Sequence, residues 1–266
     1  MTGKSAAGSI METVRTIFWA LIIAGVFRTV FFQPFWIPSE SMKENLLIGD
    51  YLFINKWAYG YSRFSCPFNA CPITGRLWGA EPERGDVVVF AHPVSGVVMV
   101  KRLIALPGER VQVRGGLVYL DNELAPQVPD GEFAEVMGPQ GSMDNRPRCQ
   151  NAPVADGEIC TRARAIETLP GGVRHTVLNI ADNDYGDNTE VFTVPAGHYF
   201  FMGDNRDNSL DSRFSQDMRG VGMVPYENLI GRADMALFSS AGRSLFYVWT
   251  WRADRFFKFI HQVPAT

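Results

Sequence analysis

The sequence predicts a mostly β protein with one apolar helix at its N-terminus. Short runs rich in Val, Ile, Phe and Tyr recur along the chain between turn residues, which is typical of strands. The 25 Gly and 16 Pro residues among 266 supply those turns and argue against a helical bundle. This length fits one or two domains. The net charge of −3 leaves no basic excess, so we expect no nucleic-acid partner.

The N-terminal helix is predicted from TIFWALIIAGVF, an uncharged run over residues 16–27. A membrane span, the core of a cleaved signal peptide and a buried helix all fit its length. We favour a transmembrane helix over residues 16–34, because no small-x-small cleavage site follows and Arg28 could reach the membrane interface. Two basic residues precede the run, so the positive-inside rule places residues 1–15 in the cytoplasm and the remaining chain across the membrane.

Three strands are expected next, over residues 50–55, 86–90 and 97–106. The third, VVMVKRLIAL, is almost wholly apolar and should be buried on both faces; Pro107 and Gly108 end it. These strands make residues 35–109 the first part of a β-domain.

The sequence pattern changes after residue 109, from buried apolar strands to a hairpin and a polar stretch, and we therefore predict an inserted smaller β-domain over residues 110–195. VQVRGGLVYL predicts a hairpin with a Gly-Gly turn, and a polar, Pro-rich stretch follows it. The main domain resumes over residues 196–242, where the buried-strand pattern YFFM leads into GDNRDNSLDSR. Residues 243–266 mix aromatic and basic side chains, which suits a membrane-surface segment and an aromatic core segment equally.

The four cysteines form two local pairs, Cys66 with Cys71 and Cys149 with Cys160. Such spacing suits short disulfide loops in an oxidising compartment, which agrees with a domain beyond the membrane. Zinc is the alternative, but neither pair has C-x₂-C spacing or a nearby His, and we expect no metal. Four free thiols are the third alternative.

Ser39 and Ser41 stand one residue apart in FWIPSESM, just past the apolar run. Such serines are ordinarily caps or turn residues, and a nucleophilic serine needs a base within hydrogen-bond reach. None of the four histidines sits in a recognisable triad motif, and no serine has a G-x-S-x-G environment, so a histidine base has weak support.

Lys101 is the candidate base, provided that burial keeps its amine neutral. Strand alternation places Lys101 on one face with Met99 and Leu103, an apolar surface that should lower its pKa. Arg102 cannot replace it, because a guanidinium stays protonated. The alternative is a lysine at a strand end that reaches solvent, since buried lysines are rare.

Three motifs, FWIPSESM, VKRLIALPGE and YFFMGDNRDNSLDSR, occur in this order behind the apolar segment. Together they closely resemble the bacterial type I signal peptidases, the membrane-bound leader peptidases. The resemblance implies an N-terminal transmembrane helix followed by a signal-peptidase-like antiparallel β catalytic domain with the inserted smaller β-domain. It also implies a serine endopeptidase of the bacterial inner membrane, single-pass, with its catalytic domain on the periplasmic side.

The implied reaction removes signal peptides from exported preproteins after small residues, at Ala-x-Ala sites, through a Ser/Lys dyad and an acyl-enzyme. The implied partners are preprotein signal peptides and the lipid bilayer, with no cofactor, and the chain is expected to function as a monomer.

By the same resemblance, Ser41 is the nucleophile and Lys101 the general base. Ser39 would form an oxyanion hole with the Ser41 backbone N–H, and Ser209 would orient the Lys101 amine. The residues expected to hold the supporting turn are Asp204, Asp211 and Arg213. Those expected to line shallow apolar pockets for the substrate are Phe35, Ile37, Pro38, Met42, Leu46 and Val100.

Two features depart from the family pattern. The family has small residues such as Pro-Thr shortly after its Ser-Met pair, where this chain has Glu44 and Asn45 after Lys43. A longer segment, FSQDMRGVGM, also follows Arg213, and its contacts cannot be predicted.

Two other functions agree less well with the sequence. A penicillin-recognising Ser/Lys acyltransferase needs S-x-x-K, but Lys43 stands two residues after Ser41 and four after Ser39. An anchored non-catalytic β-domain that binds exported chains would leave the serines, the lysine and the GDNRDNS motif unexplained.

Overall fold

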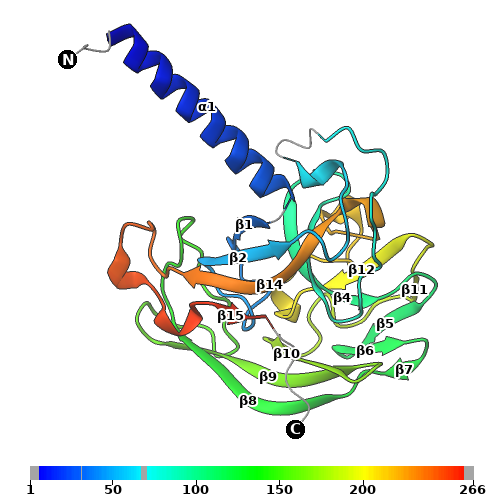
Figure 1. The fold of residues 1–266 in the computed structure, drawn as a ribbon. Coiled ribbons are helices and arrows are strands. Elements are labelled where there is room, and N and C mark those ends of the chain that lie inside the picture. The colour runs from blue at the N-terminus through cyan, green and yellow to red at the C-terminus, as the bar shows by residue number, and fades with distance from the viewer. Residues whose placement is uncertain (1–5, 31, 67–70, 261–266) are drawn as a thin grey trace.

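A single long helix projects from a body built of β-sheets (Figure 1). The computed structural model describes residues 6–30, 32–66 and 71–260. Its longer elements are α1 (Ala6–Val30), β1 (Phe32–Trp36), β2 (Asp50–Asn55), β3 (Val87–Ala91), β4 (Val98–Ala105), β5 (Arg110–Arg114), β6 (Leu117–Leu120), β8 (Gln127–Val136), β9 (Ile159–Leu169), β10 (Val173–Asn179), β12 (His198–Met202) and β14 (Leu229–Ser239). Two-residue strands are β7 (Glu123–Leu124), β11 (Phe192–Thr193), β13 (Val224–Pro225) and β15 (Lys258–Phe259). The prediction of a mostly β chain is confirmed.

The largest sheet in the described residues has the order β1-β2-β14-β3-β4-β12-β13, with β15 paired to β14. Neighbouring strands of this sheet run antiparallel. Because β14 pairs with both β2 and β3, a strand from near the C-terminus lies between two strands from the first half of the chain. The strand β12 pairs with β4 and thereby sets the GDNRDNS segment beside the strand that carries Lys101. Both β3 and most of β4 are buried, as their apolar sequences predict.

The region between β4 and β12 folds into two further sheets. One has the order β11-β5-β6-β7 and the other β10-β9-β8, which forms the long ribbon along the bottom of Figure 1. The predicted hairpin is β5 and β6, and its turn residues Gly115 and Gly116 have positive φ of 54° and 76°, a conformation that glycine adopts without strain. We call residues 110–195 the insert.

The helix α1 differs at both ends from the predicted helix of residues 16–34. It begins at Ala6 and ends at Val30, and Phe32–Trp36 forms β1 against β2. Pro34 lies inside β1, and a proline there would remove a hydrogen bond from a continuing helix and clash with the preceding turn. Within residues 6–30, 32–66 and 71–260, no helix combines the length and the apolarity needed to cross a membrane. The predicted interface contact of Arg28 concerns a side chain outside the described part.

The end of the described chain consists of short 3-10 turns, Val248–Thr250 and Ala253–Arg255, and the strand β15. Large aromatic side chains here point outward, with Phe246 88% and Trp249 76% exposed. The segment is therefore no aromatic core element, and its contact with lipid stays a prediction. Arg255, in contrast, is buried in an ion pair with Asp50.

Candidate active site

Ser41 and Lys101, 60 residues apart in sequence, meet in the folded chain. The Lys101 amine and the Ser41 hydroxyl are hydrogen-bonded to each other, and the two residues are only 2% and 7% exposed. Lys101 lies in the middle of β4, opposite Val88 of β3, so the sheet fixes its backbone. Ser41 lies in the loop between β1 and β2.

Burial sets the protonation of Lys101. Desolvation lowers the pKa of the Lys101 amine to about 8, with Asp211 and Asp204 opposing this decrease and Arg213 favouring it. With that pKa, roughly one amine in ten is neutral at pH 7, whereas an ordinary lysine is neutral in fewer than about one in a thousand molecules. A neutral amine hydrogen-bonded to a serine hydroxyl can accept its proton.

The other two predicted serines, Ser39 and Ser209, line the same cavity as Ser41 and Lys101. Ser39 Oγ is 3.4 Å from Ser41 Oγ. Ser209 lines the same cavity as Ser41 and Lys101, but its buried hydroxyl makes no hydrogen bond to any described residue. The predicted hydrogen bond from Ser209 to Lys101 is thus not formed here. Ser209 packs instead against Gly203, where a Cβ atom would collide with its Oγ.

Two buried ion pairs hold the turn behind the lysine. Arg102 donates to both carboxylate oxygens of Asp204 at 2.7 Å. Arg213 donates to both oxygens of Asp211 at 2.9 Å, and the Gly203 N–H donates to Asp211 at 3.0 Å. Burial alone would raise the pKa of each carboxyl, but the paired guanidinium outweighs it and holds both pKa values below the ordinary range.

Asn45 contributes to the same turn, although it stands where the sequence departs from the family pattern. Its amide donates to Asp204 at 2.7 Å. The sequence did not predict this contact, because it joins residues 159 apart.

A family model for signal peptidases, peptidase S26, matches residues 10–238. The chain belongs to this family. It is accordingly a serine endopeptidase, a hydrolase. Among curated relatives, it is 36% identical to a signal peptidase I of Rickettsia typhi, over 84% of this chain and 78% of the relative. It is 34% identical to a signal peptidase I of Rickettsia akari, over 86% and 81%.

A solved structure of a signal peptidase I from Enterococcus faecalis shares 23% identity. It covers 57% of this chain and 97% of that one, with a TM-score of 0.30. At that score the likeness carries no structural argument.

A cavity of about 470 Å³ opens beside the serine and the lysine of this signal peptidase family member. Phe214 and Met218, from the long segment after Arg213, line it, and Tyr185 stacks on Phe214 with ring centroids 5.6 Å apart. Arg148 of the insert also faces the cavity. Sequence reasoning missed these wall residues, because no motif marks them and they converge only in the fold.

The predicted substrate-pocket residues lie next to Ser41 but are largely covered. One core cluster contains Ile37, Met42, Leu46 and Val100, each at most 6% exposed. Phe35 packs against this cluster, and Pro38 is partly buried. Their packing fixes the loop that carries Ser41, while their contact with substrate stays a prediction.

The structure joins Cys66 to Cys71 and Cys149 to Cys160. The second disulfide lies in the insert, where Cys160 of β9 pairs in register with Glu135 of β8.

Proposed function

We propose that this chain is a membrane-attached endopeptidase that removes N-terminal signal peptides from exported preproteins after small residues, at Ala-x-Ala sites. The observation that carries this proposal is the buried, hydrogen-bonded pair of Ser41 and Lys101. Membership of the signal peptidase family and the names of the relatives support the substrate class.

The reaction would proceed by two acyl transfers. Neutral Lys101 takes the Ser41 proton while Ser41 Oγ attacks the scissile carbonyl carbon. The Ser39 hydroxyl and the Ser41 backbone N–H would stabilise the oxyanion. As the intermediate collapses, protonated Lys101 gives its proton to the departing amine, which becomes the N-terminus of the mature protein, and the signal peptide stays esterified to Ser41.

The second half releases the signal peptide. Lys101, neutral again, takes a proton from a water molecule whose oxygen attacks the ester carbonyl carbon. The Ser41 oxygen leaves and recovers its proton from Lys101, and the signal peptide departs as a free acid. No cofactor enters either half.

We also propose that the N-terminal region attaches the enzyme to the bacterial inner membrane, as a single-pass anchor with the β-domain on the periplasmic side. Support comes from the apolar side chains of α1, such as Leu21 at 68% and Ile23 at 66% exposure, because exposed apolar surface of this extent needs an apolar surrounding. The two disulfides suit an oxidising compartment.

The test is cleavage of a preprotein with an Ala-x-Ala site by the full chain in detergent, comparing the wild type with Ser41→Ala and Lys101→Ala. We expect both variants to lose activity by at least about 10³-fold, because neither partner acts without the other. Circular dichroism checks that they remain folded. Wild-type cleavage by either folded variant would exclude this site and require another base. Absence of cleavage by the wild type itself would favour a β-domain that only binds exported chains.

A further inference from the structure

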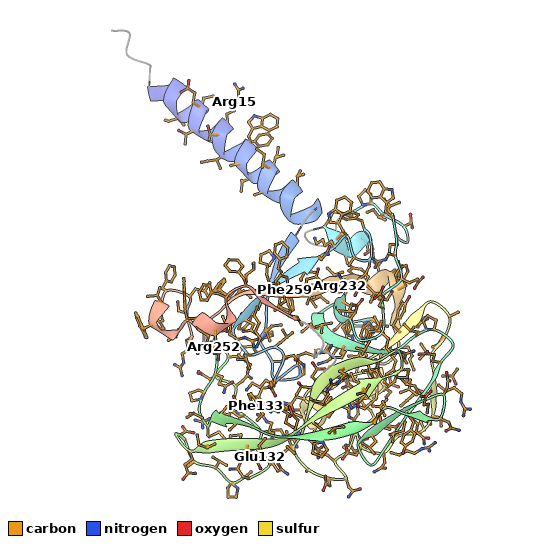
Figure 2. The ribbon with its side chains drawn as sticks, turned by 60° about the horizontal axis from the view of Figure 1, so that its bottom comes forward. Arg15, Glu132, Phe133, Arg232, Arg252 and Phe259 are labelled. Carbon is orange, nitrogen blue, oxygen red and sulfur yellow. A yellow bond between two sulfur atoms is a disulfide. The ribbon has the colours of Figure 1, made fainter. Side chains whose placement is uncertain are left out.

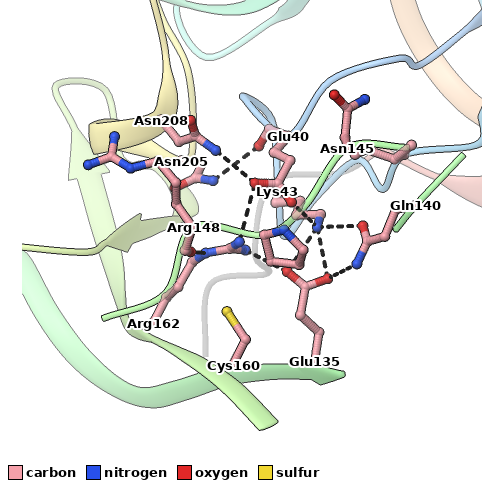
Figure 3. Close-up of polar contacts among 12 residues, drawn as sticks. Glu40, Lys43, Glu135, Gln140, Asn145, Arg148, Cys160, Arg162, Asn205 and Asn208 are labelled. Atoms are coloured by element: carbon pink, nitrogen blue, oxygen red, sulfur yellow. Dashed lines mark hydrogen bonds and ion pairs between the residues drawn. The ribbon is translucent and has the colours of Figure 1, made fainter. Parts of the chain in front are cut away.

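Four charged side chains meet beside Ser41, three of them buried and the fourth, Glu135, 14% exposed. Lys43 Nζ lies 2.6 Å from a Glu40 oxygen and 2.8 Å from a Glu135 oxygen. Arg162 bridges the same two carboxylates, at 2.8 Å to Glu135 and 3.3 Å to Glu40. Figure 3 shows these contacts, with Gln140 closing the group on one side. We call these four residues the ion cluster.

The ion cluster joins the insert to the loop between β1 and β2 that carries Ser41. Glu40 and Lys43 stand on either side of Ser41, whereas Glu135 belongs to β8 and Arg162 to β9. The Lys43 to Glu135 contact spans 92 residues of sequence and the Arg162 to Glu40 contact 122. Figure 2 shows the neighbouring β8 residues Glu132 and Phe133 near the bottom of the view.

The main chain around Ser41 is fixed by amides as well. Asn145 of the insert donates to the Pro38 carbonyl at 2.7 Å. Asn205 donates through its side chain to the Glu40 carbonyl at 3.2 Å and through its backbone N–H to the Ser41 carbonyl at 3.0 Å. Asn208 donates to the Glu40 carboxylate at 2.7 Å. The nucleophile is thus held from two directions, by the insert and by the turn that follows β12.

Stability alone gives little reason for such a cluster. The four charges sum to zero, so they compensate one another, but the cost of removing buried ions from water largely cancels their attraction. Apolar side chains of similar volume often stabilise such a site as well or better. What the ions provide is directional contact between the sheet that contains β8 and β9 and the loop that carries Ser41. A displacement of about 1 Å at a nucleophile can cost on the order of 10²-fold in rate.

We propose that the insert positions Ser41 for catalysis through the ion cluster, with Lys43 and Glu135 as positioning residues. The inference rests on the function proposed above, in which Ser41 is the nucleophile. It assigns a role to the insert in the reaction itself, namely to hold the loop so that the Ser41 hydroxyl stays against the Lys101 amine.

The experiment compares Glu135→Gln, Lys43→Met and the double variant in full-length enzyme, measuring kcat, KM and Tm on an Ala-x-Ala peptide. Each single variant leaves a net charge in the cluster and is expected to lower both Tm and kcat. The double variant leaves the neutral pair of Glu40 and Arg162, so its Tm should exceed that of either single variant. Its kcat should still lie at least about ten-fold below the wild type, with KM within about two-fold, because the contact from β8 to the loop is gone.

Two control variants separate positioning from stability. Asp156→Asn breaks an exposed ion pair with Arg146 elsewhere in the insert and should change neither Tm nor kcat. Val113→Ala removes buried volume from the other sheet of the insert and should lower Tm while leaving kcat unchanged.

Recovery of wild-type kcat by the double variant, or a loss of kcat in Val113→Ala equal to that in Glu135→Gln, would overturn the positioning role. Ser41→Ala, assayed beside them, separates this failure from failure of the proposed function. If Ser41→Ala keeps wild-type activity, both proposals fall; if it is inactive while the double variant is fully active, only the positioning role falls.

Discussion

Lys101 owes its chemistry to its place in a strand. Its neighbours on β4 are buried, with Leu103 fully so, and desolvation outweighs the two nearby carboxylates to bring its pKa to about 8. Those carboxylates are engaged by Arg102 and Arg213, which limits how far they stabilise the ammonium. Burial thus gives this single lysine the lowered pKa that the proposed base needs, and the pairing of the nearby carboxylates preserves it.

Activity should therefore rise with pH. Because the neutral amine is the base and its pKa is about 8, kcat/KM should fall roughly ten-fold per pH unit below that value and level off above it. The measurement is a pH profile of kcat/KM on a peptide without titrating groups. A flat profile from about pH 6 to pH 9 would be incompatible with Lys101 as the base.

Arg102 should matter mainly for stability. Arg102→Met leaves the Asp204 carboxylate buried without its bidentate partner, which should cost about 3 to 5 kcal/mol of the free energy of unfolding. Urea denaturation measures this loss. The double variant Arg102→Met/Asp204→Asn should lose clearly less, since no charge is left uncompensated, and equal losses would count against this account.

Among the elements, β8 and β9 are the strands of the insert that contact the loop carrying Ser41. Arg162 of β9 donates to the Arg148 carbonyl at 2.6 Å, next to Cys149, while Cys160 pairs with Glu135 across the two strands. The disulfide between Cys149 and Cys160 therefore fastens the segment that presents Arg148 to the cavity.

Removing this disulfide should destabilise the protein. The double substitution Cys149→Ser/Cys160→Ser opens a loop with a sequence separation of 11, and we expect a loss of about 2 to 4 kcal/mol in the free energy of unfolding. The matched control is Cys66→Ser/Cys71→Ser, whose separation of 5 predicts a loss smaller by about 0.6 kcal/mol. Urea denaturation of both variants checks the order, and a larger loss for the shorter loop would contradict it.

For the whole molecule, the main feature is a helix that stands apart from the sheets. Figure 2 shows the side chains of α1 directed outward along its length, with Arg15 on the part of the helix remote from the body. Ser41 follows the end of α1 at Val30 by 11 residues (41 − 30), through β1, so attachment by α1 would keep Ser41 and Lys101 within about 40 Å of the membrane surface.

Charges on α1 should release the enzyme from membranes. Ile17→Glu/Leu21→Glu places two carboxylates among exposed apolar side chains, and each charged residue in a membrane helix costs about 2.5 to 3.5 kcal/mol. Fractionation of cells after alkaline carbonate treatment measures the membrane-bound fraction. The control Val128→Glu adds a charge at an exposed position of β8 and should leave that fraction unchanged. Retention of the α1 variant equal to that of the wild type would refute the anchor.

The sequence alone determined the β class, several of the strands, among them β2, β3 and β4, and the family, because alternating and buried-strand patterns are local and the three motifs are contiguous. It also identified Ser41 and Lys101 as candidates through the motifs that contain them, and a lysine inside an apolar strand is in addition a local signal. The end of α1 was harder to locate, because apolar residues continue past Val30 and only Pro34 marks the change.

The tertiary structure alone decided what surrounds Ser41 and Lys101. Phe214, Met218 and Tyr185 form the cavity wall, and Glu135 and Arg162 join Glu40 and Lys43, through contacts between residues far apart in sequence. Charged residues in a sequence normally indicate a solvent-exposed position. No local sequence pattern distinguishes the charged residues that are buried and paired with one another. Burial and pairing are properties of the packed sheets, so the contacts between the insert and the loop of Ser41 could be seen only in the folded chain.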